Sequence, residues 1–390
     1  MARAVPVRAL GAAMFAVLSV PACAPTRTTP AALPRACADE ASVRRTVQRV
    51  VGSQENVGLS IAMSRDGQRV GSWQFGFADL EDSTRVTART RFPTASVTKA
   101  FTGIALLQAA ERGEVDLDAP IQRYVPAFPV KPGGPITLRL LAANLSGIRH
   151  WTTERTPELY ARHIEDVRDI LLLFANDTLV VAPDVQYSYS SYGYNLIAIA
   201  LQAASGRPYQ ELVRRHIITP LGLYATDFND IRTVMPHRVR HYSFYDLTTF
   251  AELSSPVRVP DWSYSHNMAG GNIISTADDL VRLGNAMLAP GLLSAASLEG
   301  ATGRSRGTKV VSPMSFGWFV ADSTVPERRI HINGSNAGVG SALFVYPDSR
   351  VVVAILSNTW GKGSRSGDLT GSQPAQLPSQ LAALCGVRVM

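Results

Sequence analysis

Strand-like segments stand near both ends of this 390-residue sequence, and a long helical stretch separates them. Two apolar runs, 57–64 and 70–77, flank Arg65-Asp66-Gly67, and Asp-Gly is typical of a tight hairpin turn. Strand-like runs return late in the chain at 315–321, 329–333, 341–346 and 350–357. Because strands must bury their apolar faces against one another or against helices, the early and late runs are expected to meet in one antiparallel sheet.

Helical periodicity fills the middle of the chain and both of its flanks. Residues 40–52 place Val43, Val47, Val50 and Val51 on one face of a helix. Further helices are predicted at 97–111, 137–144, 156–175, 192–204, 208–217, 275–288 (with Ser275 as N-cap) and 375–385. The predicted fold class is therefore α+β: an antiparallel sheet flanked by N- and C-terminal helices, plus a mostly helical second domain.

This order of segments predicts a discontinuous sheet domain, formed by residues 39–92 and 275–390, and a helical domain formed by 93–274. A cleft between two such domains is the expected place for a functional site. With 46% hydrophobic and 18% charged residues, the composition excludes a disordered chain.

The N-terminus has the pattern of a secretory signal over residues 1–24: two early arginines, a short apolar stretch and small residues. Two processing routes stay open, namely cleavage after Ala24 or acylation of Cys23 in a lipobox-like Val20-Pro21-Ala22-Cys23. Residues 25–38, rich in Pro, Thr and Ala, are expected to form a tether. We therefore expect an exported protein, either in the bacterial periplasm or anchored to a membrane as a lipoprotein.

The expected export determines how the three cysteines of the chain are interpreted. Export places the protein in an oxidising compartment. If Cys23 is removed or acylated, Cys37 and Cys385 remain as a pair. The sequence thus predicts a disulfide that links the first helix to the last.

Charge and motif content exclude several function classes. Lys and Arg number 38 against 31 Asp and Glu, but no run of basic residues exceeds two, so no nucleic-acid partner is expected. No P-loop or dinucleotide fingerprint occurs, so no nucleotide cofactor is expected. His237 and His241 lack the glutamate of a His-Glu-x-x-His zinc motif, so no metal is expected.

The segment Ser96-Val97-Thr98-Lys99 stands where an apolar helix begins. Residues three apart share a helix face, so Lys99 lies one turn from Ser96. A serine hydroxyl needs a base, and a lysine kept neutral by burial can take its proton. The N–H groups at the helix start can stabilise an oxyanion. The segment predicts a nucleophile and its base, although the same spacing also occurs on ordinary helix faces.

Two later segments carry aromatic and small residues at element boundaries. Residues 187–195 place Tyr189 just before a predicted helix, where a phenol either relays a proton or packs in the core. Residues 329–338 end a strand in small residues, and Gly334 and Gly338 allow a ligand to approach the strand edge. Backbone N–H groups there are candidates for substrate binding or for a second oxyanion donor.

In this order the three segments resemble the Ser-x-x-Lys, Tyr-x-[Asn/Ser] and [Lys/His]-x-Gly motifs of the serine beta-lactamase and penicillin-binding-protein superfamily. The resemblance is to the class C beta-lactamase and D-Ala-D-Ala carboxypeptidase type, and it covers most of residues 40–360. Segments 140–150 and 269–280 are similar to further patterns of the family. Segments 120–126 and 146–151 look closest to the mitochondrial LACTB-like branch, which contains peptidases and esterases more than antibiotic-degrading enzymes.

The resemblance implies a role for each matching residue. Ser96 would be the acylated nucleophile, Lys99 would take its proton, and Tyr189 would return a proton to the leaving group. Ser191 would hydrogen-bond Lys99 or the substrate. The backbone N–H groups of Ser96 and Ser335 would form the oxyanion hole, and the substrate-binding candidates on the same strand are His331, Asn333 and Gly334.

The sequence departs from the family pattern at two places. Alignment of the third motif on Gly334 puts Ile332, and not His331, at the position of the family's cation. Adjacent residues of a strand point to opposite faces, so a local bulge is expected to turn His331 inward; without a bulge, the cation is missing and binding of a substrate carboxylate is in doubt. Asn144 also replaces a histidine of the family, which suggests a structural role.

The sequence therefore predicts an exported serine hydrolase that acts through an acyl-enzyme on a small ester, amide, peptide or beta-lactam, without a cofactor. One alternative is a binding protein of the same fold that has lost turnover. Another is an unrelated esterase that uses Ser305 of Gly303-Arg304-Ser305-Arg306-Gly307, although this segment lacks the strand and helix that a nucleophile elbow requires. The substrate and the oligomeric state do not follow from the sequence.

Overall fold

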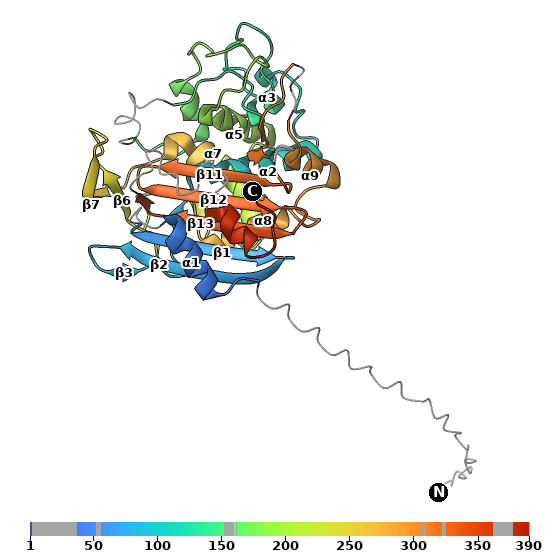
Figure 1. The fold of residues 1–390 in the computed structure, drawn as a ribbon. Helices are drawn as coiled ribbons and strands as arrows, with labels where there is room; N and C mark the ends of the chain where they lie inside the picture. Colours follow the sequence, from blue (N-terminus) through green and yellow to red (C-terminus); the bar gives the residue numbers. More distant parts are fainter. Residues whose placement is uncertain are drawn as a thin grey trace. The chain divides into compact units, whose positions relative to one another are not determined.

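An eight-stranded antiparallel sheet forms the centre of the computed structural model (Figure 1). The strand order is β3-β2-β1-β13-β12-β11-β10-β9. The strands are β1 Gly58–Arg65, β2 Gln68–Asp79, β3 Thr84–Arg85, β9 Met314–Ser315, β10 Trp318–Val320, β11 Ile330–Asn336, β12 Val339–Tyr346 and β13 Val351–Ser357. The structure describes Met1 and residues 37–51, 56–151, 160, 162–305, 307, 309–321, 325–361 and 377–389.

The early and late strands meet at the centre of the sheet, as the sequence predicts. Strand β1 pairs antiparallel with β13, and Ile61 lies opposite Ile355. The β1–β2 hairpin turns at Asp66 and Gly67, whose φ angles of 52° and 75° are those that a tight hairpin turn requires. The α+β fold class is confirmed.

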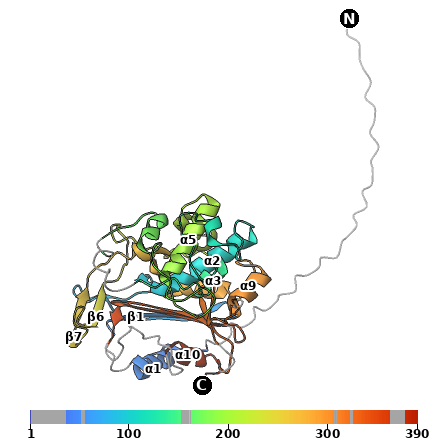
Figure 2. The ribbon, with the colours of Figure 1, turned by 90° about the horizontal axis from the view of Figure 1, so that it is seen from above.

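Two terminal helices cover one face of the sheet (Figure 2). Helix α1 (Glu40–Val51) and helix α10 (Leu377–Ala383) pack side by side on β1, β12 and β13, and together they enclose an apolar cluster. Cys37 and Cys385 form a disulfide whose Cα atoms are 4.8 Å apart, although 348 residues separate them along the chain. The bridge joins the first helix to the last, as the cysteine count indicates.

Removal of this bridge should lower the thermal stability of the protein measurably. A disulfide that closes a long loop typically contributes about 2–5 kcal/mol, largely by restricting the unfolded chain. The double variant Cys37→Ala, Cys385→Ala should therefore unfold roughly 3–6 °C below the oxidised protein. Calorimetry with and without reductant provides the control, because reductant should shift the wild type and leave the variant unchanged. Equal unfolding temperatures would show that the bridge does not stabilise the protein.

Helices cover the opposite face of the sheet (Figures 1 and 2). They are α2 Thr98–Glu111, α3 Leu138–Ala142, α5 Ser191–Ser205, α6 Tyr209–Val213 with the π-turn Arg214–Ile218, α7 Met268–Gly271, α8 Ala277–Ala286 and α9 Ala295–Thr302. One continuous apolar core joins them to the sheet. Helix α2 approaches so closely that a Cβ atom on Gly103 would lie 1.7 Å from the Phe316 carbonyl oxygen, so only glycine fits there.

Parts of the inserted region differ from the sequence-based prediction. The helix predicted at 156–175 is wrong over residues 162–173: residues 162–166 are irregular, and a 3₁₀ helix follows at Val167–Leu173. The reason is tertiary, because the Ile164 N–H donates to Ser265 Oγ and not to a helical carbonyl. Thr276, and not Ser275, caps α8.

Two small sheets are not predicted by the sequence. The hairpin of β6 (His241–Tyr245) and β7 (Glu252–Val259) pairs with β14 (Thr359–Trp360). Near the site, β4 (Phe92–Pro93), β8 (Ile273–Ser275) and β5 (Asp227–Phe228) form a second sheet. This second sheet fixes the chain on either side of Ser96, because Thr94 N–H donates to the Ile273 carbonyl and Thr98 Oγ1 accepts from the Ile273 N–H.

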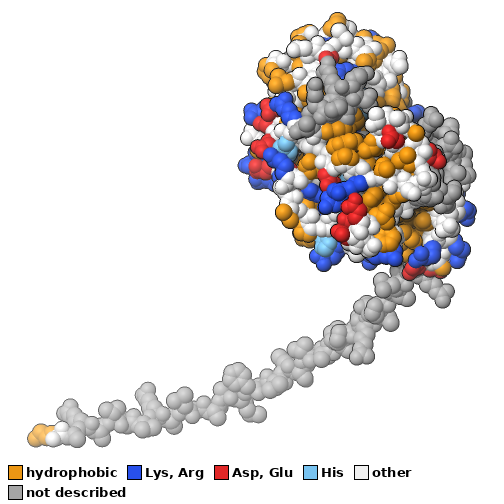
Figure 3. All heavy atoms as spheres, turned by 90° about the vertical axis from the view of Figure 1, so that its left-hand side faces the viewer, with side chains coloured by type: hydrophobic (Ala, Val, Ile, Leu, Met, Phe, Trp, Pro, Cys, Tyr) orange, Lys and Arg blue, Asp and Glu red, His pale blue; other side chains and the backbone are white. Residues whose placement is uncertain are grey.

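Arginines alternate with acidic side chains on the face shown in Figure 3. Beside the β6–β7 hairpin, Arg240 and Arg258 both form ion pairs with Asp261. Among the described residues, no helix has the length and apolar character needed to cross a membrane.

Candidate active site

Ser96 occupies an exceptional position at the start of α2. From Phe92 to Leu107 every residue is buried except Ser96, which is partly exposed. It lies in the 3₁₀ turn Ala95–Val97 that leads into the helix. Ala95 has φ 44°, a conformation that costs energy for a residue other than glycine. The backbone therefore holds this one hydroxyl at the surface of an otherwise buried segment.

The Lys99 amine is fully buried next to Ser96. Its Nζ lies 3.2 Å from Ser96 Oγ, 2.9 Å from Ser191 Oγ and 2.7 Å from the Gly270 carbonyl oxygen. The Lys99 side chain is 0% exposed. Burial lowers the pKa of the Lys99 amine, opposed by smaller upward influences from Tyr189. The site thus favours the neutral amine at a lower pH than for a lysine in water.

The Tyr189 hydroxyl donates a hydrogen bond to Ser96 Oγ over 2.8 Å. The Tyr189 ring also faces the amine of Lys99, with Nζ 4.8 Å from the ring centre. Lys99 in turn connects Ser96 Oγ to Ser191 Oγ at the start of α5. The structure therefore brings the first and second sequence motifs, which are more than 90 residues apart, into direct contact.

Asn144 anchors the loop that carries Tyr189. Its backbone oxygen accepts from Ser188 N–H and its side-chain oxygen accepts from Ser190 N–H, both over 2.9 Å. Asn144 itself is 0% exposed and has φ 54°, which asparagine tolerates better than most residues. Asn144 thus holds the backbone on both sides of Tyr189, which is a structural role.

His150 is a site residue that the sequence analysis did not single out. Its Nδ1 accepts from the Ser191 N–H over 3.2 Å, and its ring lies edge-on to Tyr189 with centres 5.4 Å apart. Burial, with the charges of Lys99 and Arg149, lowers the pKa of His150 to about 3. His150 is therefore neutral at physiological pH, and the accepting Nδ1 leaves the proton on Nε2.

The strand β11 closes the other side of the site through Gly334. A Cβ atom there would lie 2.3 Å from the Thr94 oxygen and 2.7 Å from the Ser96 nitrogen. Ser341, which is opposite Gly334 on β12, donates to the Thr94 oxygen over 2.6 Å and ties the two segments together. The third motif thus lies directly against the N–H of Ser96, and Ser335 follows Gly334 on the strand.

The bulge expected to turn His331 inward is absent, and that prediction is wrong. The pairing of β11 with β12 runs without a shift from Ile330 to Asn336. His331 packs against Phe319 and Phe344 on the face of the terminal helices. Strand alternation puts Asn333 on that same face. Ile332 points to the opposite face of the sheet, where it is 0% exposed in the apolar core shared with α2, α5 and α8. The third motif therefore contributes no cation to the site.

Aromatic rings continue outward from Tyr189 and His150. Trp151 contacts both His150 and His266, and Tyr160 lies against His266 and stacks on Trp262 with ring centres 4.7 Å apart. Burial lowers the pKa of His266 to about 4, against an opposing contribution from the Ser263 backbone. This row presents aromatic ring faces, and its two histidines are neutral at physiological pH. No spacing pattern marks it, because its rings come from three separate segments.

The remaining sequence candidates lie elsewhere. Ser305 is buried, and its hydroxyl lies 2.8 Å from that of Ser315. Cys23 lies outside the described residues. Across the described ranges, no three His, Cys, Asp or Glu side chains gather as a metal site would require.

The fold and the site together define a class of protein, the serine hydrolases of the beta-lactamase fold. Its features here are an antiparallel sheet with terminal helices on one face and, on the other, a Ser-x-x-Lys segment that contacts a tyrosine. The family model described as Beta-lactamase matches residues 43–373, and the chain belongs to this family.

Individual comparisons agree with this family. The human mitochondrial serine beta-lactamase-like protein LACTB is 28% identical over 313 residues, which is 63% of this chain and 56% of LACTB. The chain thus matches little more than half the length of that relative. The octameric penicillin-binding protein homologue from Pyrococcus abyssi superposes with a TM-score of 0.73 at 19% identity, covering 89% of this chain and 77% of that one. A D-stereospecific amidohydrolase from Streptomyces gives 0.71 at 23% identity, covering 90% and 100%.

Proposed function

We infer that the protein is a serine hydrolase that forms an acyl-enzyme on Ser96 and acts on small, uncharged esters or amides. The observation that carries this proposal is the convergence of two groups on Ser96 Oγ: the Lys99 amine 3.2 Å away, and the Tyr189 hydroxyl, which donates to it over 2.8 Å. A buried amine of lowered pKa beside a partly exposed hydroxyl is an arrangement suited to nucleophilic catalysis.

In the acylation step, Ser96 Oγ attacks the carbonyl carbon while its proton passes to the neutral Lys99 amine. The oxyanion that forms is stabilised by the N–H groups of Ser96 and Ser335, where the 3₁₀ turn Ala95–Val97 meets β11. As the bond to the leaving group breaks, Tyr189 gives that alcohol or amine a proton and recovers one from Lys99. Water then repeats these steps on the acyl-Ser96 ester and releases the acid.

The substrate class follows from the charges around Ser96. Ile332 stands where the family pattern has a cation, and His331 faces the other side of the sheet. His150 and His266 are neutral above about pH 5, given their lowered pKa values. A substrate carboxylate would find no ion-pair partner on β11, whereas an uncharged apolar group matches the aromatic row. These features favour an esterase or amidase over a carboxypeptidase or a beta-lactamase.

Labelling of wild type and Ser96→Ala with a fluorescent fluorophosphonate tests this function. The wild type should label and Ser96→Ala should not, with Ser305→Ala labelling like the wild type as the matched control. A p-nitrophenyl ester should be hydrolysed at a kcat/KM at least about 10²-fold above that for nitrocefin, the carboxylate-bearing beta-lactam, which corresponds to the loss of one charged contact.

Each other outcome points to a definite alternative. No label in either form would support the binding protein that lacks turnover. Equal labelling in both forms would place the nucleophile elsewhere, with Ser305 the next candidate. A preference for nitrocefin would contradict the uncharged substrate class while leaving the acyl-enzyme intact.

Export is part of the proposed function. It rests on the signal-like pattern of residues 1–24, which belong to the part of the chain that the structure leaves undescribed except for Met1, and on the Cys37–Cys385 disulfide, which suits an oxidising compartment.

A further inference from the structure

A separate cavity of about 550 Å³ lies beside α7. Its walls come from residues 163–166, the ends of α5 and α6, and the chain that follows β5. Met268, Phe228 and Ile164 form an apolar part of the lining. Ser96, Lys99 and Tyr189 do not line it, so this cavity is distinct from the candidate active site.

Two buried amide oxygens of the lining have no hydrogen-bond partner among the described residues. They are Oδ1 of Asn229 and Oδ1 of Asn272. Both residues are only 5% exposed, and the Asn229 N–H donates to the Asn272 carbonyl over 2.8 Å, which holds them side by side. Buried polar atoms are nearly always paired. Two unpaired acceptors in one cavity therefore point to a bound group that carries hydrogen-bond donors.

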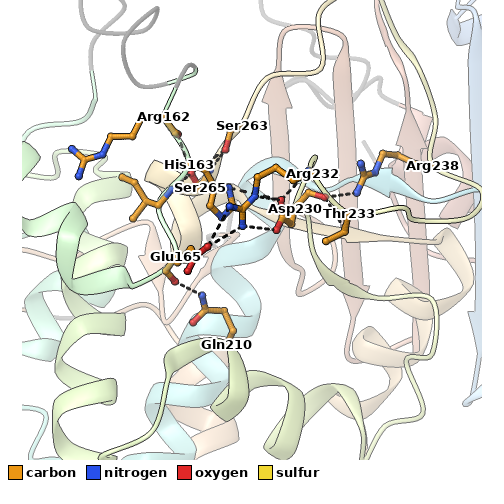
Figure 4. Close-up of polar contacts among 11 residues, drawn as sticks. Arg162, His163, Glu165, Gln210, Asp230, Arg232, Thr233, Arg238, Ser263 and Ser265 are labelled. Carbon is orange, nitrogen blue, oxygen red and sulfur yellow. Dashed lines mark hydrogen bonds and ion pairs between the residues drawn. The ribbon is translucent and has the colours of Figure 1, made fainter.

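The mouth of the cavity carries an excess negative charge. Arg232 lies between two carboxylates, 3.2 Å from Glu165 and 3.0 Å from Asp230 (Figure 4). One guanidinium thus serves two carboxylates, which leaves this triad with a net charge of minus one. Among the other ionised groups of the lining, Asp166 pairs with Arg168, Glu211 with Arg207 and Arg214 with Asp227. The imidazole of His163 also lines the cavity, with its Nδ1 3.8 Å from Asp230 Oδ1.

We propose that this cavity binds a small primary ammonium compound. The ammonium N–H groups donate to Asn229 Oδ1 and Asn272 Oδ1, and its positive charge balances the Glu165–Arg232–Asp230 triad. The alkyl part of the ligand covers the apolar side chains of Met268, Phe228 and Ile164. An inorganic cation would satisfy the oxygens but would leave this apolar lining uncovered.

Titration with n-butylammonium tests the proposal, with saturation-transfer NMR and calorimetry as readouts. n-Butanol and butyrate, which match it in chain length, should bind at least about tenfold more weakly because they lack the charge or carry the wrong one. Asn229→Leu and Asn272→Leu should each weaken butylammonium binding at least about tenfold. Ser96→Ala should bind it like the wild type, which separates this cavity from the active site.

A third variant keeps the test independent of folding. The Glu165 side chain is 76% exposed, so Glu165→Gln neutralises one mouth carboxylate without disturbing the core. It should weaken butylammonium binding about three- to tenfold and reduce the dependence of binding on salt. The proposal is overturned if butylammonium does not bind the wild type at millimolar concentration, if butanol or potassium binds equally well, or if Glu165→Gln has no effect.

Discussion

Replacement of Lys99 by methionine should lower the rate of acylation about 10²–10⁴-fold, as expected for the loss of a positioned base. Methionine keeps most of the buried volume but cannot accept a proton, and it leaves Ser191 Oγ and the Gly270 carbonyl without the amine. The measurement is the rate of fluorophosphonate labelling, or of the ester burst, under single-turnover conditions.

A second lysine offers a matched control. The Lys131 amine also donates to two backbone carbonyls, those of Ala175 and Asp177. It belongs to a different part of the helical region and contacts none of Ser96, Ser191 or Gly270. Lys131→Met should therefore keep the acylation rate within about twofold. An unchanged rate in Lys99→Met would remove this amine from the mechanism.

The pH dependence of the acylation rate, compared between the wild type and Lys99→Met, tests whether Lys99 acts as the base. Because burial lowers the pKa of Lys99, the wild-type rate should rise with pH through that lowered value and level off below 10.5. Lys99→Met should lack this rise.

The free energy of unfolding should depend on pH in the same direction. Between the lowered pKa of Lys99 and 10.5, the unfolded chain binds one proton more than the folded protein, so the wild type should gain stability relative to Lys99→Met as the pH increases.

The parts of this fold that the sequence predicts are those with a local or periodic cause. Asp66-Gly67 determines a hairpin by its conformational preference, and the alternation of strand residues determines which face each side chain takes. Ser96 and Lys99 share a helix face for the same kind of reason. Strand alternation alone would have placed His331 correctly, because the pairing of β11 with β12 is regular.

The parts that the sequence does not predict depend on contacts between distant segments. Residues 162–166 leave the helical path because Ser265, about a hundred residues later, takes the Ile164 N–H. His150 enters the site through the backbone of Ser191, and the aromatic row joins Trp151, Tyr160 and Trp262 from three segments. No periodicity within any one of these segments carries that information.

The contact between β11 and Ser96 leads to the second large prediction: Gly334→Ala should lower kcat/KM for an ester at least about 10²-fold. The new methyl carbon would lie within 2.4 Å of the Thr94 oxygen and the Ser341 hydroxyl, and 2.7 Å from the Ser96 nitrogen. Backbone atoms cannot rotate away as a side chain can, so the strand must move outward. That movement separates the Ser96 and Ser335 N–H groups, and loss of one oxyanion donor costs roughly 10²–10³ in rate.

Gly300→Ala provides the control for this substitution. Gly300 lies in α9, and a Cβ atom added there meets nothing within 4 Å, so activity should stay within about twofold. Thermal unfolding of both variants separates a local effect from global loss of structure, because the rate of Gly334→Ala is measured well below its own unfolding temperature. Full activity in a folded Gly334→Ala would mean that the oxyanion is not held between the turn Ala95–Val97 and β11, since that gap cannot accept a methyl group unchanged.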